Sequence, residues 1–447
     1  LSGEGSGAWS RTAAENDTYT LSPPATGWTR GTRDLNVNAT DVAGNTLATL
    51  AASYVVKLEF DDFQAAAVVI GQRDFEGTSE NQGGPPDANT LNGPFGSPTI
   101  AADGKLFIGD YDNNRVLVYK AVPTANGANA DFVLGQPDFT SNTYSVARGT
   151  HPAPQQVATG NGKLLVTDAG GARVIIYDSI PMSGSAVQSV VVGQPGFTSF
   201  GTACDAASLN GPQAATATPE GKLIVADSSN HRVLIWNSMP TTNGQPADVV
   251  VGQADFTHCA ANDDDRDGAD NTSPTARTLS RPSGVWSDGN RLVVNDFRNN
   301  RVLIWNQVPT SNFQPADVVL GQGSFTLRAP NDDNQAGTHD AAPTARTPAQ
   351  PYTGVASNGV QLAVADVSNN RVLVWNSFPS ANFQAADVVL GQGMVGLASH
   401  NDDNQDGTSE AAASARVLHN PRGLLFHQDK LLVVDGNNSR VLVFRSR

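Results

Sequence analysis

The chain has 447 residues and a formal net charge of −15 at pH 7, with only 16% charged residues. This acidic balance disfavours nucleic acid and anionic membranes as partners and favours cations, and no apolar run approaches the length of a transmembrane helix. The 43 Gly and 26 Pro residues, with many Asn, Asp and Thr, are typical of a turn-rich, all-β protein. The first residue is Leu rather than Met, so we expect a processed or trimmed chain.

Residues 1–57 differ from the rest of the sequence. The stretch ATDVAGN at 39–45 resembles the closing strands of a bacterial Ig-like domain. A complete sandwich of this kind needs around seven strands and about 100 residues, so 1–57 is about half a domain. Either its front has been removed, or the half-sandwich is completed elsewhere. In the second case it packs on the rest of the chain or accepts strands from another chain, which predicts self-assembly through residues 1–57.

Two motifs alternate six times between residues 58 and 447. The first is Asp-x4-Arg followed by an apolar run and an aromatic residue, as in DVSNNRVLVWN at 366–376. The second is an apolar run ending in Gly-Gln, as in DVVLGQ at 387–392. The arginines of the first motif are Arg115, Arg173, Arg232, Arg301, Arg371 and Arg440. The glutamines of the second are Gln72, Gln136, Gln194, Gln253, Gln322 and Gln392.

Each repeat contains four short runs rich in Val, Leu and Ile, separated by turn sequences such as Asp-Gly and Asn-Gly. Several runs are apolar on both faces, which suits strands that are covered on both sides. Four strands per repeat, with each sheet stacked on its neighbours, predict a six-bladed β-propeller. The motifs recur because a single blade cannot bury its own faces.

The phase of the repeat predicts how the propeller closes. The chain enters on a Gly-Gln strand at 65–72 and leaves on the Arg-containing strand at 440–444. The sixth blade is therefore complete only if residues 65–72 supply its outermost strand, which also hides the open sheet edges. The predicted domains are a partial Ig-like segment at 1–57 and the propeller at 58–447.

These motifs resemble the NHL-repeat family of six-bladed propellers, in its bacterial exported form. The similarity rests on GQPDFTSN, LNGP and GKLIVADSSNHRVLIW, and it covers roughly residues 60–447. It implies the fold more than the activity, because propellers host many functions. Two lyases share this fold: the peptide α-amidating lyase, whose metal is held by histidines, and streptogramin B lyase. The seven histidines of this chain fall at scattered phases of the repeat, which disfavours the amidating lyase.

The recurrent Asp–Arg pairs are interpreted as structural, since a catalytic site would need one copy and not six. We expect each Asp to bond the turn between the second and third strands, and each Arg to pair with it or with a neighbouring blade. The aromatic residues that follow are expected to pack between blades. These are Tyr119, Tyr177, Trp236, Trp305, Trp375 and Phe444.

Residues at the start of the innermost strands should line the mouth of the central channel, and they differ between blades as a binding site requires. The candidates are Phe95, Gln155, Gln213, Arg281, Tyr352, His419 and Arg422. Two arginines with glutamines and a tyrosine could hold a carboxylate or a sugar. The competing interpretation is an ordinary polar lining around trapped water.

Three acidic loops precede the last three blades: NDDDRDG at 262–268, NDDNQAG at 331–337 and NDDNQDG at 401–407. The first and third match the opening of a calcium loop, D-x-[DN]-x-[DN]-G, whereas Ala336 replaces a ligand in the second. The predicted calcium ligands are Asp263, Asp265, Asp267, Asp332, Asn334, Asp402, Asn404 and Asp406, with Asp340 or Glu410 as further neighbours. None of the loops has Glu at the twelfth position, so they are not EF-hands, and the alternative is a solvated turn.

The two cysteines, Cys204 and Cys259, follow Gly-Gln strands of adjacent blades, and we expect them to form a disulfide. The repeat type, the few Lys and the many Thr and Asn predict an exported bacterial protein. We therefore expect a non-enzymatic propeller outside the cell or at its surface, with possible Ca²⁺ and a protein or glycan partner. The alternative is a channel-mouth lyase or hydrolase that acts on a small anionic or glycan substrate.

Overall fold

The computed structural model describes residues 9–12, 18–21, 31–37, 50–56 and 59–447, and the chain divides into two compact units. The first unit comprises Leu1–Phe60, Phe426–Leu431 and Arg445–Arg447. In it, β1 (Trp9–Thr12) pairs with β2 (Thr18–Leu21), and β3 (Gly31–Val37) pairs with β4 (Leu50–Val56), both antiparallel. The Ig-like identification and association through 1–57 stay predictions, because the other residues of that segment lie outside the described ones.

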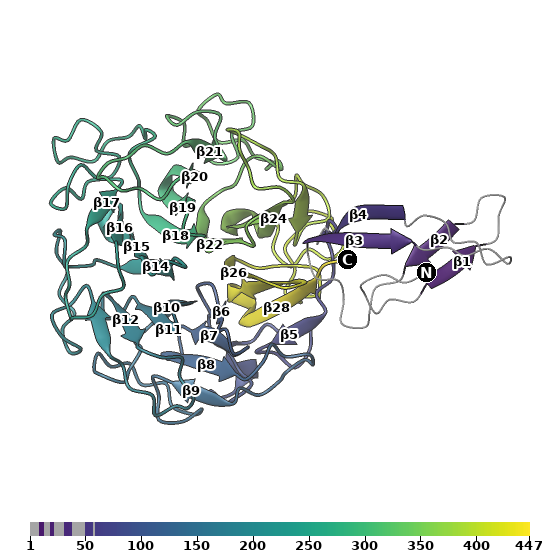
Figure 1. The fold of residues 1–447 in the computed structure, drawn as a ribbon, viewed down its shortest axis with the longest axis horizontal. Helices are drawn as coiled ribbons and strands as arrows, with labels where there is room; N and C mark the ends of the chain where they lie inside the picture. The colour runs from purple at the N-terminus through teal and green to yellow at the C-terminus, as the bar shows by residue number, and fades with distance from the viewer. Residues whose placement is uncertain (1–8, 13–17, 22–30, 38–49, 57–58) are drawn as a thin grey trace. The chain divides into compact units, whose positions relative to one another are not determined.

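Six four-stranded antiparallel sheets are arranged around a common centre within the described residues, which confirms the predicted six-bladed propeller (Figure 1). The first three blades are β6 (Thr99–Ile100), β7 (Leu106–Asp110), β8 (Arg115–Tyr119) and β9 (Phe132–Leu134); β10 (Pro154–Gly160), β11 (Lys163–Asp168), β12 (Arg173–Tyr177) and β13 (Val190–Val192); and β14 (Pro212–Ala217), β15 (Leu223–Asp227), β16 (Arg232–Trp236) and β17 (Val249–Val251). The last three are β18 (Pro282–Ser287), β19 (Leu292–Asp296), β20 (Arg301–Trp305) and β21 (Val318–Leu320); β22 (Pro351–Ser357), β23 (Leu362–Asp366), β24 (Arg371–Trp375) and β25 (Val388–Leu390); and β26 (Pro421–His427), β27 (Lys430–Asp435), β28 (Arg440–Arg445) and β5 (Val68–Ile70).

The sixth blade is closed by the N-terminal strand β5, as predicted. β5 pairs antiparallel with β28, with Val69 opposite Leu442. The residues before β5 also take part, because the Asp62 carboxylate accepts a hydrogen bond from the Val389 N–H at 2.8 Å. One blade earlier, the Asn382 side-chain oxygen accepts the equivalent bond from the Val319 N–H at 3.0 Å. Residues 62–70 therefore replace both the loop and the outer strand that the C-terminal repeat lacks.

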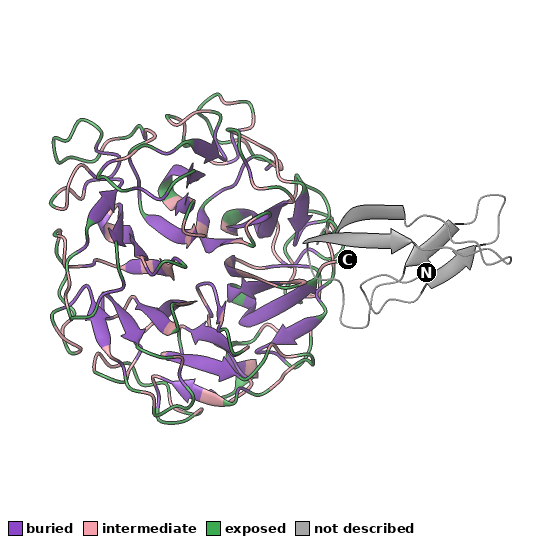
Figure 2. Cartoon of the chain, viewed as in Figure 1, coloured by how far each residue is buried: buried purple, intermediate pink, exposed green. Residues whose placement is uncertain are grey.

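The apolar core lies between the blades rather than within them. Each of the described clusters combines buried residues of two neighbouring sheets, as when Ile224 and Val233 of the third blade pack with Leu303 and Trp305 of the fourth. Figure 2 shows the strands of the propeller mostly buried, whereas its connecting loops mix exposed, intermediate and buried residues. This arrangement gives the physical reason for the repeat, because each blade depends on its neighbours to remove both of its faces from water.

Short 3₁₀ helices form four of the turns between second and third strands: η2 (Ser228–Asn230), η3 (Phe297–Asn299), η4 (Val367–Asn369) and η5 (Gly436–Asn438). A fifth, η1 (Glu80–Gly83), lies between β5 and β6. Each of η2 to η5 is followed by a left-handed residue and then by the arginine of the first motif, as with Asn300 and Arg301. Within the described residues no helix is long and apolar enough to cross a membrane.

The Asp–Arg pair of each repeat is a buried ion pair that joins the turn to the adjacent loop. In the fourth blade the Arg301 Nε lies 2.8 Å from the Asp296 Oδ2, and both side chains are inaccessible to solvent. The Arg301 Nη2 donates to the carbonyls of Thr275 and Thr278 at 3.0 and 2.9 Å. The Asn299 amide donates to the same Asp296 oxygen at 2.7 Å. This geometry agrees with the structural role expected for the Asp–Arg pair.

The glutamine of the second motif holds the loop that follows it. The Gln322 Nε2 donates to the carbonyl of Asn300 at 3.0 Å and to that of Ala329 at 2.8 Å. The preceding Gly321 has a φ of +91°, a conformation that favours glycine. The Gly-Gln sequence therefore turns the chain out of the outer strand and ties the next loop to the turn of its own blade.

Candidate functional site

The acidic loops and the turns between second and third strands meet on one face of the propeller. The loops connect the outer strand of one blade to the inner strand of the next, and each begins with an asparagine in the left-handed conformation. The amides of Asn262 and Asn299 exchange hydrogen bonds of 3.1 and 2.8 Å. Asn331 with Asn369, and Asn401 with Asn438, make the same exchange. Each acidic loop is therefore fixed to a turn that a buried Asp–Arg pair holds.

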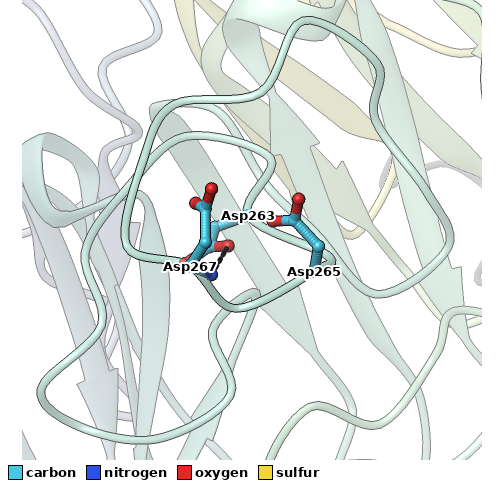
Figure 3. A group of neighbouring side chains, drawn as sticks. All are labelled: Asp263, Asp265 and Asp267. Carbon is cyan, nitrogen blue, oxygen red and sulfur yellow. Dashed lines mark hydrogen bonds between the residues drawn. The ribbon is translucent and has the colours of Figure 1, made fainter.

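The first acidic loop gathers three carboxylates (Figure 3). One oxygen of each of Asp263, Asp265 and Asp267 lies within 4.8 Å of the others. Asp263 is 1% exposed and accepts the N–H groups of Asp267 and Gly268 at 3.1 and 3.2 Å. The Asn271 amide donates to Asp265 at 3.0 Å and lowers the pKa of that carboxyl. The three side chains thus bring oxygen donors together around one point.

The second and third acidic loops share this frame but present fewer carboxylates. Asp332 accepts the N–H groups of Ala336 and Gly337, and Asp402 accepts those of Asp406 and Gly407. The Asn334 amide donates to Asp340 at 3.1 Å, and the Asn404 amide donates to Glu410 at 2.9 Å. The donor and acceptor positions are exchanged in the first loop, because there Asn271 donates to Asp265. Among the His, Cys, Asp and Glu residues that the structure describes, only the first loop forms a group able to hold an ion.

Two of the predicted channel-mouth residues, Tyr352 and Arg422, lie together around Phe95. The Arg422 guanidinium is 4.3 Å from the centre of the Phe95 ring, and the Tyr352 ring is 5.2 Å from it. The other side of Tyr352 meets Phe297 at 4.7 Å. Burial raises the pKa of Tyr352 and lowers that of Arg422. The mouth therefore contains a neutral phenol and a guanidinium, both packed against aromatic rings.

The inner strands approach too closely for side chains at some positions. A Cβ on Gly96 would lie 2.4 Å from the Gln155 carbonyl oxygen, and one on Gly423 would lie 2.3 Å from the Gly96 carbonyl oxygen. The backbones of the inner strands lie too close together at these points for a side chain, which explains why Gly96 of GPFG and Gly423 of NPRG are glycines. The side-chain oxygens of Gln155 and Gln213 are buried near these strands, and no donor in the described part of the chain reaches them.

His419 and Arg281 lie in other surroundings. The His419 ring stacks on His400 with 3.9 Å between centroids, and its Nε2 is 3.2 Å from the Asn437 amide nitrogen. Burial and the neighbouring His400 lower the pKa of His419. Arg281 lines a surface pocket that contains neither Tyr352 nor Arg422. The seven predicted channel-mouth residues are therefore distributed over several environments.

The pocket at Arg281 was not predicted from the sequence. It has a volume of about 360 Å³, and its lining includes Arg281, Arg298, Arg328, His231, Asp270 and Asn271. These residues come from the turns of the third and fourth blades and from the loops before and after the fourth blade. No local sequence motif predicts a pocket built from these residues. The only indication in the sequence was that equivalent positions of the repeats carry different side chains.

The two cysteines lie in neighbouring loops and form a disulfide in the structure, with a Cα–Cα distance of 6.2 Å. Cys204 precedes β14 and Cys259 follows β17, so the link spans the whole third blade. A closed loop of 55 residues restricts the unfolded chain considerably.

We expect replacement of both cysteines, Cys204→Ser with Cys259→Ser, to lower the free energy of unfolding by about 3 kcal/mol, measured by chemical denaturation. Reduction of the wild-type protein should have the same effect and should leave the double variant unchanged. The denatured, non-reduced protein should show no free thiol, and a count of two would contradict the bond.

The comparison with protein families agrees with the repeat. The NHL repeat family model matches residues 209–236, which include β14, β15 and β16 of the third blade. No curated protein sequence matches the chain. Among solved structures, a protein of unknown function from Bacteroides thetaiotaomicron is 12% identical over 98% of this chain and 87% of that one, with a TM-score of 0.47.

Two enzymes are also among the similar structures. Virginiamycin B lyase from Staphylococcus aureus is 13% identical, covers 80% of this chain and 97% of its own, and has a TM-score of 0.36. The PQQ-bound aldose sugar dehydrogenase from Streptomyces coelicolor is 15% identical, covers 81% and 96%, and has a TM-score of 0.42. At these values the similarities carry no argument about activity.

Proposed function

We propose that this six-bladed propeller, which carries an NHL repeat, is a non-enzymatic binding module outside the cell, and that calcium stabilises its binding face. The binding face is the one formed by the acidic loops and by the turns with the Asp–Arg pairs. A protein or a glycan at the cell surface is the proposed partner.

The observation that carries this proposal is the convergence of Asp263, Asp265 and Asp267 within 4.8 Å. Three carboxylates so close repel one another unless a cation neutralises them. Their donor atoms are all hard oxygens, without His or Cys, which fits calcium better than zinc or copper. When bound, calcium would supply positive charge that holds the loop closed. Asp402, Asn404 and Asp406 offer a weaker set, and Asp332 with Asn334 the weakest.

The contacts at the channel mouth support binding over catalysis. Arg422 and Tyr352 make ring contacts that hold the inner strands together, with Thr353 bonding the Arg422 carbonyl at 2.5 Å. The disulfide between two exposed loops supports an oxidising compartment. The alternative of a lyase or hydrolase requires a substrate at Tyr352 and Arg422, and it stays a prediction.

Calcium is expected to raise the melting temperature of the full chain relative to a chelator. A ligand that binds only the folded state stabilises it by about 2.7 kcal/mol at a hundredfold excess over its dissociation constant. Asp265→Ala should abolish most of this shift, since it removes one of three carboxylates. Asn404→Ala, in the third loop, should remove a smaller part of the shift, because its loop offers the weaker set of oxygen donors. The measurement is a thermal melt in calcium and in chelator for the three proteins.

Identical melting temperatures in calcium and in chelator would contradict the proposal and leave the loops as solvated turns. If Asn404→Ala abolishes the calcium-dependent rise in melting temperature and Asp265→Ala does not, the calcium site lies in the third acidic loop instead of the first. Magnesium at the same concentration tests selectivity, because its strict octahedral geometry suits this wide loop poorly.

A further inference from the structure

We propose that the pocket lined by Arg281, Arg298 and Arg328 binds a small ligand that carries two or more carboxylate groups. The inference names a ligand class for the binding face and rests on the proposed binding role, although not on calcium. We call this site the arginine pocket.

The three guanidinium groups of the arginine pocket have no partner within the described part of the chain. Within the described residues none of them forms an ion pair with a carboxylate, although the sequence has 43 acidic and only 28 basic residues. Several other exposed arginines lie over aromatic rings, as Arg277 does over Phe313 and Arg346 over Phe383. The guanidinium groups of the pocket therefore remain available to an anion.

The backbone holds each arginine in place. The Arg281 N–H donates to the His231 Nδ1 at 3.1 Å, and the Arg298 N–H donates to the Ser280 carbonyl at 3.1 Å. The Arg328 carbonyl accepts the Asn300 amide at 2.9 Å. A site with anchored backbone loses less entropy when a ligand binds, which favours affinity.

The rest of the lining is rich in hydrogen-bond donors. Burial lowers the pKa of His231, so its ring is neutral at pH 7. Because its Nδ1 accepts from Arg281, its proton lies on Nε2 and provides a further donor. Asn271 and Thr272 add polar groups, and the one lining carboxylate, Asp270, accepts the Ala261 N–H at 2.7 Å.

The size of the pocket and the number of arginines select the ligand. A volume of about 360 Å³ lies at the lower end of small-molecule sites. It is roughly ten times the ~30 Å³ of a water molecule, so a single inorganic anion would leave most of it empty. The planar fork of a guanidinium pairs best with a carboxylate or phosphate. Three such forks from three loops suit several carboxylates on one small molecule.

The test is calorimetric titration of the full chain with tricarballylate, a tricarboxylate, at low ionic strength in calcium and in chelator. The wild type should bind it in both conditions. Arg298→Gln and Arg328→Gln should each weaken binding about tenfold or more, since each removes a charge-assisted hydrogen bond. Arg346→Gln is the matched control, because this exposed arginine lies in the same loop as Arg328 but outside the pocket. Equal melting temperatures of the variants would show that they fold.

No binding by the wild type, or equal weakening by Arg346→Gln, would overturn the proposal. Inorganic phosphate that binds as tightly as tricarballylate would overturn the assignment to carboxylates. The two proposals fail separately. A missing calcium shift beside intact tricarballylate binding refutes only the calcium site, and the reverse result refutes only the arginine pocket.

Discussion

A chain that lacks residues 1–72 is expected to lose its cooperative unfolding transition and to aggregate. The deletion removes β5 (Val68–Ile70), so β28 exposes its backbone N–H and C=O groups at an open edge. It also removes Val68 and Ile70 from the cluster that joins the sixth blade to the first. Fully burying each such side chain is worth about 1.5–3 kcal/mol, so the loss of Val68, Ile70 and the equally buried Val69 is comparable with the whole stability of a domain.

The control is a chain that begins at Asp61, which keeps Asp62 and β5. It should unfold cooperatively, as followed by circular dichroism and light scattering during denaturation. Val69→Asp in the full chain tests the same strand by one residue, because Val69 is fully buried opposite Leu442. A chain without residues 1–72 that unfolds as cooperatively as the control would show that β5 is not needed for closure.

Arg301→Leu should lower the free energy of unfolding by about 3–5 kcal/mol, since it leaves the buried Asp296 without its partner. The carbonyls of Thr275 and Thr278 would lose their donor as well. Lys120→Ala is the control, because Lys120 pairs with Asp131 at the surface, where its side chain is 78% exposed. That change should cost at most about 1 kcal/mol.

Both variants are compared by chemical denaturation against the wild type. If Arg301→Leu costs no more than Lys120→Ala, the recurrent pair is not the structural element described above. The variant with both Asp296→Leu and Arg301→Leu should recover part of the loss, because it leaves no unpaired charge in the interior.

The fold could be predicted from the sequence because a propeller repeats its contacts. Every blade places the same residue types in the same surroundings, so the phase of six arginines and six glutamines was enough to count blades. The same phase assigned 65–72 to the last blade. It also placed Cys204 and Cys259 in neighbouring loops, because both follow Gly-Gln strands.

The candidate sites were harder to predict from the sequence, because they depend on positions at which the repeats differ. The calcium-loop sequence pattern favoured the first acidic loop over the third, because the first offers three carboxylates at the ligand positions and the third offers two and an amide. The sequence did not show that Asn404 turns its amide toward Glu410, whereas Asn271 turns its amide toward Asp265. The buried asparagine pairs were also missed, because their members lie far apart in the sequence, as do Asn262 and Asn299 with a separation of 37 residues.

Thus the sequence by itself determined the all-β class, the six blades, the closure by the N-terminal strand and the structural role expected for the Asp–Arg pairs. All of these follow from periodic burial and from turn chemistry, which are local properties that repetition amplifies. Only the tertiary structure decided that Arg281 lies with Arg298 and Arg328, and that Tyr352 and Arg422 pack on Phe95. Such groupings join residues from different loops, and their distances depend on how the blades curve around the axis.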